Sequence, residues 1–309
     1  MTRNRVLKAL YHSHPAVKRF LAWGLNYATL KLALLQRLRL RRILTNYYAD
    51  STDPEVLEVV SYLKDNPVQM IPYEYVKHHQ ARAIDIAYDE DNGYPYVMVG
   101  NDKVYFPKEM SAPGIVAAVR TAYFEQDARS PHRYLTENFK LETEDAGVFI
   151  GASDGIFCLS LLHNFNAVYL FEADPVWQKP LELTFRNWLH KVNIVPLYVS
   201  GSDSDTSVSL DTFFRKVKAN VTYIQADIEG FERSLLDGAK ALIQQSESLK
   251  ISLCTYHKHN DLAEFTELLT CAGMRVAPSR GYLIMWQQVP LEIPYLRRGV
   301  IYAEKKTGN

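Results

Sequence analysis

The run AGVFIG at residues 146–151 opens into the turn Gly151-Ala-Ser-Asp-Gly155, and this stretch decides the fold of the 309-residue chain. The apolar run predicts a buried strand, and the glycine-rich turn predicts a passage from that strand into a helix. Two later apolar runs also end in acids. AVYLFE ends at Glu172, and VTYIQAD ends at Asp227, with Glu229 close behind. Ligands of open α/β sheets lie outside the carboxyl ends of the strands, so we expect these acids to face one crevice.

The alternation of strand and helix patterns continues through the second half of the chain. Predicted strands cover 146–151, 167–172, 192–199, 220–227 and 249–256, and predicted helices cover 155–164, 176–190, 209–218, 230–246 and 259–272. This alternation favours an α/β fold with a parallel sheet that carries helices on both faces. Two last runs, YLIMWQQV and GVIYAEKK, have no helix between them. They predict an antiparallel pair at the sheet edge.

The first half of the chain has a different character. Residues 16–45 predict a long basic helix, and Asp53 or Thr52 followed by Pro54 predicts a second helix to about Lys64. Residues 94–106 predict a hairpin, and 113–124 predict another helix, followed by the polar connector EQDARSPHRYLTENF. We therefore expect a basic helical extension over 1–69, a helix and hairpin cap with the connector over 70–140, and a ligand-binding domain over 141–309.

Charge is distributed unevenly along a chain whose formal net charge is zero. Residues 1–49 hold ten Lys and Arg and no acid, whereas the remaining 25 basic residues face all 35 acids, which leaves that part at −10. The acidic second half argues against a nucleic-acid ligand, because a phosphate backbone requires a basic stripe. The basic residues 1–45 raise the alternative of peripheral contact with the inner membrane surface.

Composition further limits the class of protein. No apolar run reaches 18 residues, so the sequence predicts no transmembrane helix. Cys158, Cys254 and Cys271 are far apart and form no CxxC pair, which favours reduced thiols over a zinc site or a disulfide. We expect a cytoplasmic protein.

The glycine turn is suited to a nucleoside ligand that has no pyrophosphate. A dinucleotide fingerprint requires a second glycine where Ser153 stands, because the backbone there approaches the pyrophosphate. S-adenosylmethionine has no pyrophosphate, and its carboxylate and amine can be held by the turn and by a helix N-terminus. Glu172 lies 21 residues beyond Gly151 at the end of the next strand, where a carboxylate can accept hydrogen bonds from both ribose hydroxyls.

Asp227, Glu229 and His257 are the candidates for the chemistry. Asp227 is expected to point into the crevice, and Glu229 suits a helix cap. His257 follows the fifth predicted strand and is a suitable general base for a substrate hydroxyl. Asp227 would orient it, or would hold a divalent cation together with Glu229.

These residues fall within a wider resemblance. The stretches EQDARSPHRYL, VFIGASDGIF, LFEADP, VSLDTFF, QADIEGFERSLLDGA, CTYHKHND and LRRGVIYAEK, taken in this order, resemble the FkbM-type S-adenosylmethionine-dependent methyltransferases over residues 70–305. The resemblance implies a class I methyltransferase (Rossmann-like) sheet of seven mostly parallel strands with an N-terminal helical and hairpin extension. It also implies O-methylation of a small-molecule, sugar or lipid-linked glycan hydroxyl. For cofactor binding it singles out Gly151, Ala152, Ser153, Asp154, Gly155 and Glu172, with Ser202 and Asp203 near the adenine edge.

One departure from the family concerns the methionine end of the cofactor. Members usually carry an acid two places before the first glycine of the turn, and this chain has Phe149 there. The polar connector is expected to form a lid over the acceptor, with Ser130, His132, Arg133 and Tyr134 in contact with it. Two alternatives stay open: a non-catalytic methyltransferase-like module at a membrane surface, and an NAD-dependent oxidoreductase.

Overall fold

The computed structural model describes residues 37–286 and 292–305, which form two compact units divided between Gln69 and Met70. In the first unit, residues 37–47 are helical and α3 spans Pro54–Asp65. The Asp53 carboxylate accepts a hydrogen bond from the Glu55 N–H at 2.9 Å, which is the N-cap that the sequence predicts. Most of the expected helix over 16–45 lies outside the described residues. None of the described helices is long and apolar enough to cross a membrane.

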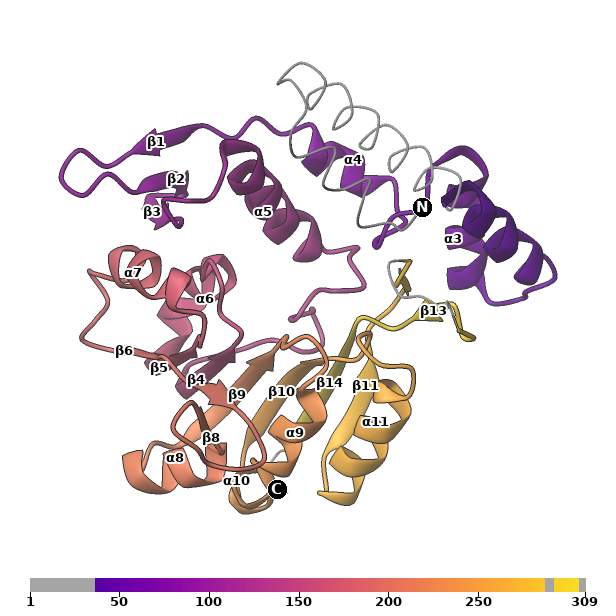
Figure 1. The fold of residues 1–309 in the computed structure, drawn as a ribbon. Helices are drawn as coiled ribbons and strands as arrows, with labels where there is room; N and C mark the ends of the chain where they lie inside the picture. Colours follow the sequence, from indigo (N-terminus) through magenta and orange to yellow (C-terminus); the bar gives the residue numbers. More distant parts are fainter. Residues whose placement is uncertain (1–36, 287–291, 306–309) are drawn as a thin grey trace, which may run out of the picture. The chain divides into compact units, whose positions relative to one another are not determined.

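The second unit is built on a seven-stranded sheet (Figure 1). Its strands are β4 (Glu144–Ile150), β5 (Phe165–Phe171), β6 (Val192–Val195), β9 (Val221–Ala226), β10 (Leu249–Cys254), β11 (Arg275–Pro278) and β14 (Val300–Lys305). Their order is β11-β14-β10-β9-β4-β5-β6. All neighbours pair in parallel except β14, which runs antiparallel to both β10 and β11. The expected class I methyltransferase fold is confirmed by this strand order.

Helices cover both faces of the sheet. They are α6 (Ile156–Leu161, continued by η1, Leu162–Asn164), α7 (Pro175–Thr184), α8 (Leu210–Val217), α9 (Glu232–Asp237), α10 (Lys240–Gln245) and α11 (Asp261–Cys271). Alternate side chains of β4 point to opposite faces. Val148 and Ile150 join the core beneath α8, α9, α10 and α11, whereas Phe149 packs against Phe157 of α6 on the other face.

The helix predicted over 230–246 is broken into α9 and α10, and Gly238 explains the break. A Cβ at Gly238 would lie 2.1 Å from the Ser200 carbonyl oxygen, so only glycine allows this approach. The Asp211 carboxylate then accepts hydrogen bonds from Ala241 N and Leu242 N, which are the free N–H groups at the start of α10. Long-range contacts override the helical pattern here.

The predicted arrangement of the C-terminal strands is wrong. β14 does not lie at the edge but between β10 and β11, and the pattern RVAP of β11 was not recognised as a strand. Part of the first expected run forms β12 (Leu283–Ile284), which pairs with β13 (Leu296–Arg297) in a separate small sheet. β11 has only four residues and no alternation of burial, which explains why its period is hard to detect.

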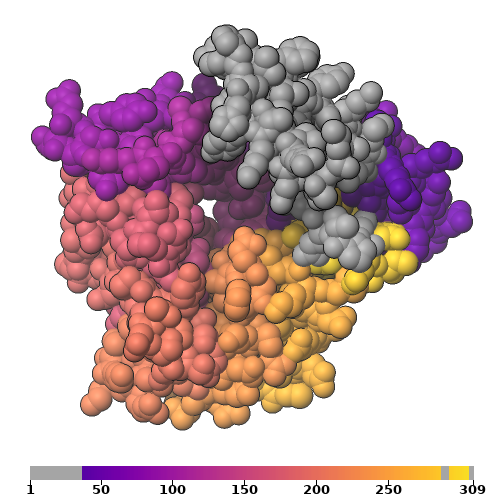
Figure 2. Space-filling model, viewed as in Figure 1, coloured from indigo at the N-terminus to yellow at the C-terminus, as the bar shows by residue number. Residues whose placement is uncertain are grey.

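A small antiparallel sheet precedes the main one. It comprises β1 (Ile86–Tyr88), β2 (Pro95–Val99) and β3 (Asp102–Tyr105), and the two helices α4 (Tyr75–Gln80) and α5 (Ala112–Glu125) lie on either side of it in the chain. β2 and β3 are the expected hairpin. Tyr105 N donates to Thr184 Oγ1 of α7 at 2.9 Å, so this sheet is attached to the methyltransferase fold. Figure 2 shows the surface of both segments in purple and pink. β7 (Tyr198–Val199) and β8 (Ser207–Val208) form a further short pair.

Candidate active site

The glycine turn after β4 touches the end of β9. Gly151 has φ +77°, and a Cβ there would lie 2.3 Å from the Asp227 carbonyl oxygen. Gly155 has φ +73° and faces the Phe185 ring, which a Cβ would approach to 2.7 Å. Ser153 adopts φ +47° without being glycine, a conformation that is uncommon for a side-chain-bearing residue. Both glycines are therefore required by close approach of other groups.

Glu172, directly after β5, is bound to this turn. Its Oε2 accepts a hydrogen bond from Ser153 N at 2.9 Å, and its Oε1 accepts one from Asp174 N at 2.9 Å. The side chain is half-buried. Each carboxylate oxygen has a second acceptor position, so Glu172 can still accept from two hydroxyls of a ligand. The turn and the acid that the sequence singles out are in direct contact.

Ser202 and Asp203 are exposed in the loop that joins β7 and β8. The Asp203 carboxylate accepts from Ser209 N at 2.7 Å at the start of α8, and this hydrogen bond lowers the pKa of Asp203. Asp203 therefore ties the β7–β8 loop to the start of α8. Its approach to an adenine edge stays a prediction.

Asp227 is the centre of a polar cluster at the end of β9. Its carboxylate accepts from Tyr134 Oη at 3.1 Å and from Tyr256 Oη at 3.2 Å. Nε2 of His132 lies 3.3 Å from Oδ2, and Nε2 of His257 lies 3.4 Å from Oδ1. Burial alone would raise the pKa of Asp227, but the bond to His132 and the charges of both imidazoles lower it to about 2. This carboxylate is ionised at neutral pH.

His257 is positioned by a second acid, Glu232. Its Nδ1 lies 2.9 Å from Glu232 Oε1, while its Nε2 faces Asp227 and lies 3.5 Å from Glu229 Oε2. Glu232 is fully buried, and the same Oε1 accepts from Ile228 N at 3.0 Å. Burial would lower the pKa of His257, but Glu232 and Asp227 raise it. Both ring nitrogens are buried, with Nδ1 facing Glu232 and Nε2 facing Asp227.

The expected lid over 130–134 needs correction. His132 is fully buried, and Ser130 and Tyr134 are at most 7% exposed. Ser252 Oγ of β10 donates to Tyr134 O at 2.7 Å, and Tyr302 Oη of β14 donates to Arg133 O at 2.6 Å. The connector is a wall of the cluster because it is bonded to β10, to β14 and to Asp227 just after β9.

Four residues of the cluster were not predicted: Glu125, Glu232, Cys254 and Tyr256. Cys254 Sγ lies 3.8 Å from His132 Nε2, and Tyr256 Oη lies 3.1 Å from the same nitrogen. Burial raises the pKa of both the thiol and the phenol well above their usual values, so each stays protonated. Glu232 could have been found from the sequence, because it stands five residues after Asp227 at the start of α9, in reach of a neighbouring strand end.

Two sets of donor atoms could hold a metal ion. They are His132, Asp227 and Cys254, and Asp227, Glu232 and His257, and within each set the donor atoms lie within 4.8 Å of one another. Glu229, the expected partner of Asp227, has φ +53° and an 89% exposed side chain. Both sets depend on Asp227, whose oxygens already accept from two phenols.

Phe149 occupies the place at which the resembling family carries an acid. It is 1% exposed, and its ring centroid lies 5.7–6.0 Å from those of Phe157, Phe165 and Tyr223. A carboxylate would be buried here among aromatic rings without a donor, at high cost. The position serves core packing.

We expect protein stability to fall between about pH 6.5 and pH 9 because of His132. Burial alone would lower the pKa of His132, but Glu125 and Asp227 raise it to about 9. A raised imidazole pKa contributes stability that is complete below the unfolded pKa of about 6.5 and is lost as pH rises through the folded value. Urea unfolding from pH 6 to pH 9.5 measures this loss, and His132→Gln should flatten it. Equal slopes in both proteins would contradict this assignment.

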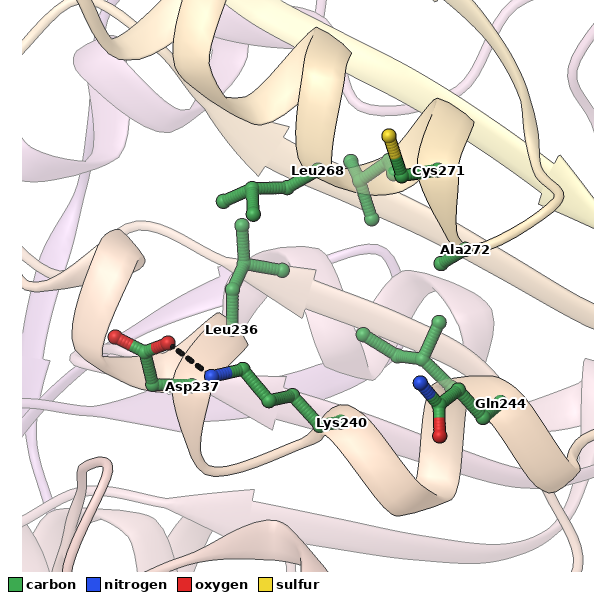
Figure 3. Close-up of a pocket in the computed structure, with 9 residues that line it drawn as sticks. Leu236, Asp237, Lys240, Gln244, Leu268, Cys271 and Ala272 are labelled. Atoms are coloured by element: carbon green, nitrogen blue, oxygen red, sulfur yellow. Dashed lines mark ion pairs between the residues drawn. The ribbon is translucent and has the colours of Figure 1, made fainter.

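A separate groove lies between α9, α10 and α11 (Figure 3). Leu236 and Leu268 contribute apolar side chains, and Asp237 pairs with Lys240 at 2.8 Å along its edge. It offers no acid–base pair of the kind found around Asp227. The strand-end cluster is therefore the candidate active site.

Among known proteins, the chain is similar to several solved structures. No protein-family model matches the chain, and no curated protein does. The METTL16 MTase domain is 12% identical with a TM-score of 0.40, over 85% of this chain and 95% of that one. M. jannaschii TYW2 in complex with AdoMet is 12% identical with a TM-score of 0.39, over 74% and 94%. Precorrin-6y C5,15-methyltransferase from Geobacter metallireducens GS-15 is 14% identical with a TM-score of 0.34, over 65% and 94%. The fold assignment rests on the strand order described above.

Proposed function

We propose that this chain is an S-adenosylmethionine-dependent O-methyltransferase that acts on a small-molecule or glycan hydroxyl. The observation that carries the proposal is the placement of two functions at one edge of the sheet. The glycine turn and Glu172 are bound to each other, and Gly151 touches the backbone of Asp227 in the acid–base cluster. A nucleoside held by the first group would bring its reactive end to the second.

The residues present fit the cofactor. Gly151 and Gly155 let the turn pack closely against Asp227 and Phe185, and Glu172, which is bonded to this turn, retains acceptor capacity for the two ribose hydroxyls. The cluster is rich in carboxylates, which suits a ligand that carries positive charge. S-adenosylmethionine supplies an electrophilic methyl group on a sulfonium ion.

His257 would act as the general base. In its neutral form, with the Nδ1 proton toward Glu232 at 2.9 Å, Nε2 would accept a proton from an acceptor hydroxyl. Asp227 beside Nε2 stabilises the imidazolium that results. Glu232 is a positioning residue, because it fixes the tautomer and the orientation of the ring. Alignment of the hydroxyl with the cofactor would supply much of the acceleration.

The methyl-transfer rate should rise with pH through the pKa of His257, because only the neutral ring accepts a proton. Glu232 is among the groups that raise this pKa. Glu232→Gln removes that charge, so the rising, low-pH limb of the kcat profile should move to lower pH while kcat falls about tenfold or more. Profiles of the two proteins from pH 5.5 to 9.5 test this. If the rising limb of the kcat profile stays at the same pH in Glu232→Gln, Glu232 does not tune His257.

We propose that the reaction does not require a divalent cation. The Asp227 oxygens accept from Tyr134 and Tyr256 and lie against two imidazoles, so a metal would have to displace these donors. Methyl transfer is expected to be unchanged after EDTA treatment and unaffected by added Mg²⁺ or Mn²⁺. Loss of activity in EDTA that is restored by one of these ions would show instead that Asp227, with Glu229 or Glu232, binds a metal.

The rim of the site favours a hydroxyl-rich acceptor such as a sugar. Phe231 is 66% exposed, it stands two residues after the exposed Glu229, and Arg133 is partly exposed in the connector. An aromatic face with an adjacent carboxylate can pack against a sugar ring and accept from its hydroxyls. The test is transfer of label from S-adenosylmethionine to a panel of sugars, glycosides and polyketide alcohols. Labelling of no hydroxyl compound would count against this acceptor class.

A further inference from the structure

Glu125, the last residue of α5, carries a carboxylate whose one ion-pair neighbour in the described part of the chain is a distant imidazole. Its side chain is only 22% exposed. Among the described residues no hydrogen bond reaches it, and its one ion-pair neighbour is His132, whose Nδ1 lies 3.9 Å from Oε2. That distance is too long for a hydrogen bond. Such a buried carboxylate costs free energy unless a ligand supplies the missing donor.

The surroundings of Glu125 add negative charge. Asp154 of the glycine turn, Asp227 and Glu229 all act on it electrostatically. With Glu232, the crevice holds five carboxylates against two imidazoles, His132 and His257. In the part of the chain that the structure describes, no Lys or Arg lies within ion-pair distance of any of the five. Even with both imidazoles charged, the site has a deficit of positive charge.

A second observation points to a missing group at the same place. His132 is fully buried, and its Nδ1, on the side of Glu125, has no hydrogen-bond partner among the described residues. Buried polar atoms in native proteins are nearly always bonded. A polar ligand group between Glu125 and the turn would satisfy this region.

We propose that Glu125 binds the α-ammonium group of S-adenosylmethionine. The apolar side chain of Phe149 cannot bind this group. The inference rests on the proposed function. Asp154 connects the two regions, because it belongs to the cofactor turn and acts on Glu125. Burial, with the nearby acids, raises the pKa of Glu125 to about 7. Binding of an ammonium group would therefore release part of a proton at neutral pH.

A two-by-two calorimetric comparison tests the proposal. Wild type and Glu125→Gln are each titrated with S-adenosylhomocysteine and with its analogue lacking the α-amino group, 4-(5′-adenosylthio)butanoate. A charged hydrogen bond contributes enough for about a 10- to 100-fold loss of affinity. That loss is expected for S-adenosylhomocysteine in Glu125→Gln, while the analogue should bind both proteins alike. Glu137→Gln, which removes an exposed acid of the same connector, is the matched control and should bind as wild type.

The outcomes separate the two proposals. An equal loss for both ligands in Glu125→Gln, or no loss for either, would overturn the role of Glu125 and leave the proposed function standing. Failure of wild type to bind S-adenosylhomocysteine would defeat the proposed function itself. Titrations in buffers of different ionisation enthalpy give an independent readout: wild type should release a fraction of a proton at pH 7, and Glu125→Gln should release less. Unchanged thermal unfolding of the apo variant would establish that its fold is intact.

Discussion

Replacement of His257 by alanine is expected to lower kcat for methyl transfer about 10²- to 10⁴-fold, the range that general base catalysis supplies. His257 is 8% exposed, its Nδ1 lies 2.9 Å from Glu232, and its Nε2 lies 3.4 Å from Asp227. The other imidazole at Asp227 is His132, whose Nε2 is enclosed by Asp227, Cys254 and Tyr256. Initial rates at saturating cofactor and acceptor measure the effect.

His257→Gln separates proton transfer from shape. Glutamine retains a polar group of similar reach but cannot act as a base near neutral pH, so the account expects a comparable loss of kcat. His259→Gln, two residues further along, is the matched control and should retain activity. Undiminished transfer in His257→Ala and His257→Gln would remove His257 from the mechanism.

Replacement of Asp227 by alanine should lower the free energy of unfolding by about 3–5 kcal/mol, the cost of removing one partner of a buried charged pair. The Asp227 carboxylate accepts hydrogen bonds from Tyr134 Oη and Tyr256 Oη and lies 3.3 Å from Nε2 of the buried His132. The substitution leaves two phenols and an imidazolium without an acceptor. Chemical denaturation at pH 7 measures the loss.

Asp227→Asn distinguishes charge from shape. The amide oxygen can still accept from a phenol, so part of the stability should return, whereas the attraction for both imidazoles is lost. The pKa of His132 and that of His257 should then fall, since Asp227 raises both. Imidazole titration followed by NMR checks this. A stability for Asp227→Ala within 1 kcal/mol of wild type would contradict the central position of this carboxylate.

Much of the main sheet could be predicted because its central parallel strands are almost wholly buried and their sequences are largely continuous apolar runs. The β4, β5 and β9 patterns end in Gly151, Glu172 and Asp227, so the sequence already predicted their placement at one edge. The placement of the antiparallel strands could not be predicted from their sequence pattern. β14 pairs with β10, which lies almost fifty residues earlier, and nothing in its local pattern specifies insertion between two other strands.

The site was predictable where a residue follows a strand directly and unpredictable where it comes from elsewhere. Asp227, Glu172 and His257 were found because strand ends fix their place. Glu125 and Tyr134 reach the same cluster from α5 and the connector, whose positions depend on tertiary contacts such as Ser252 Oγ to Tyr134 O. The polarity of the connector suggested a lid, but Tyr134 and His132 are bonded to Asp227 and Tyr256, which directly follow strands of the sheet.

We propose above all that the residues at the carboxyl ends of these strands bind S-adenosylmethionine, and calorimetric titration of the full chain with S-adenosylhomocysteine tests this most directly. The account predicts one site per chain, with affinity reduced about 10- to 100-fold in Glu172→Ala because the ribose acceptor is lost. A silent titration of wild type, or binding of NAD in preference to S-adenosylhomocysteine, would contradict it.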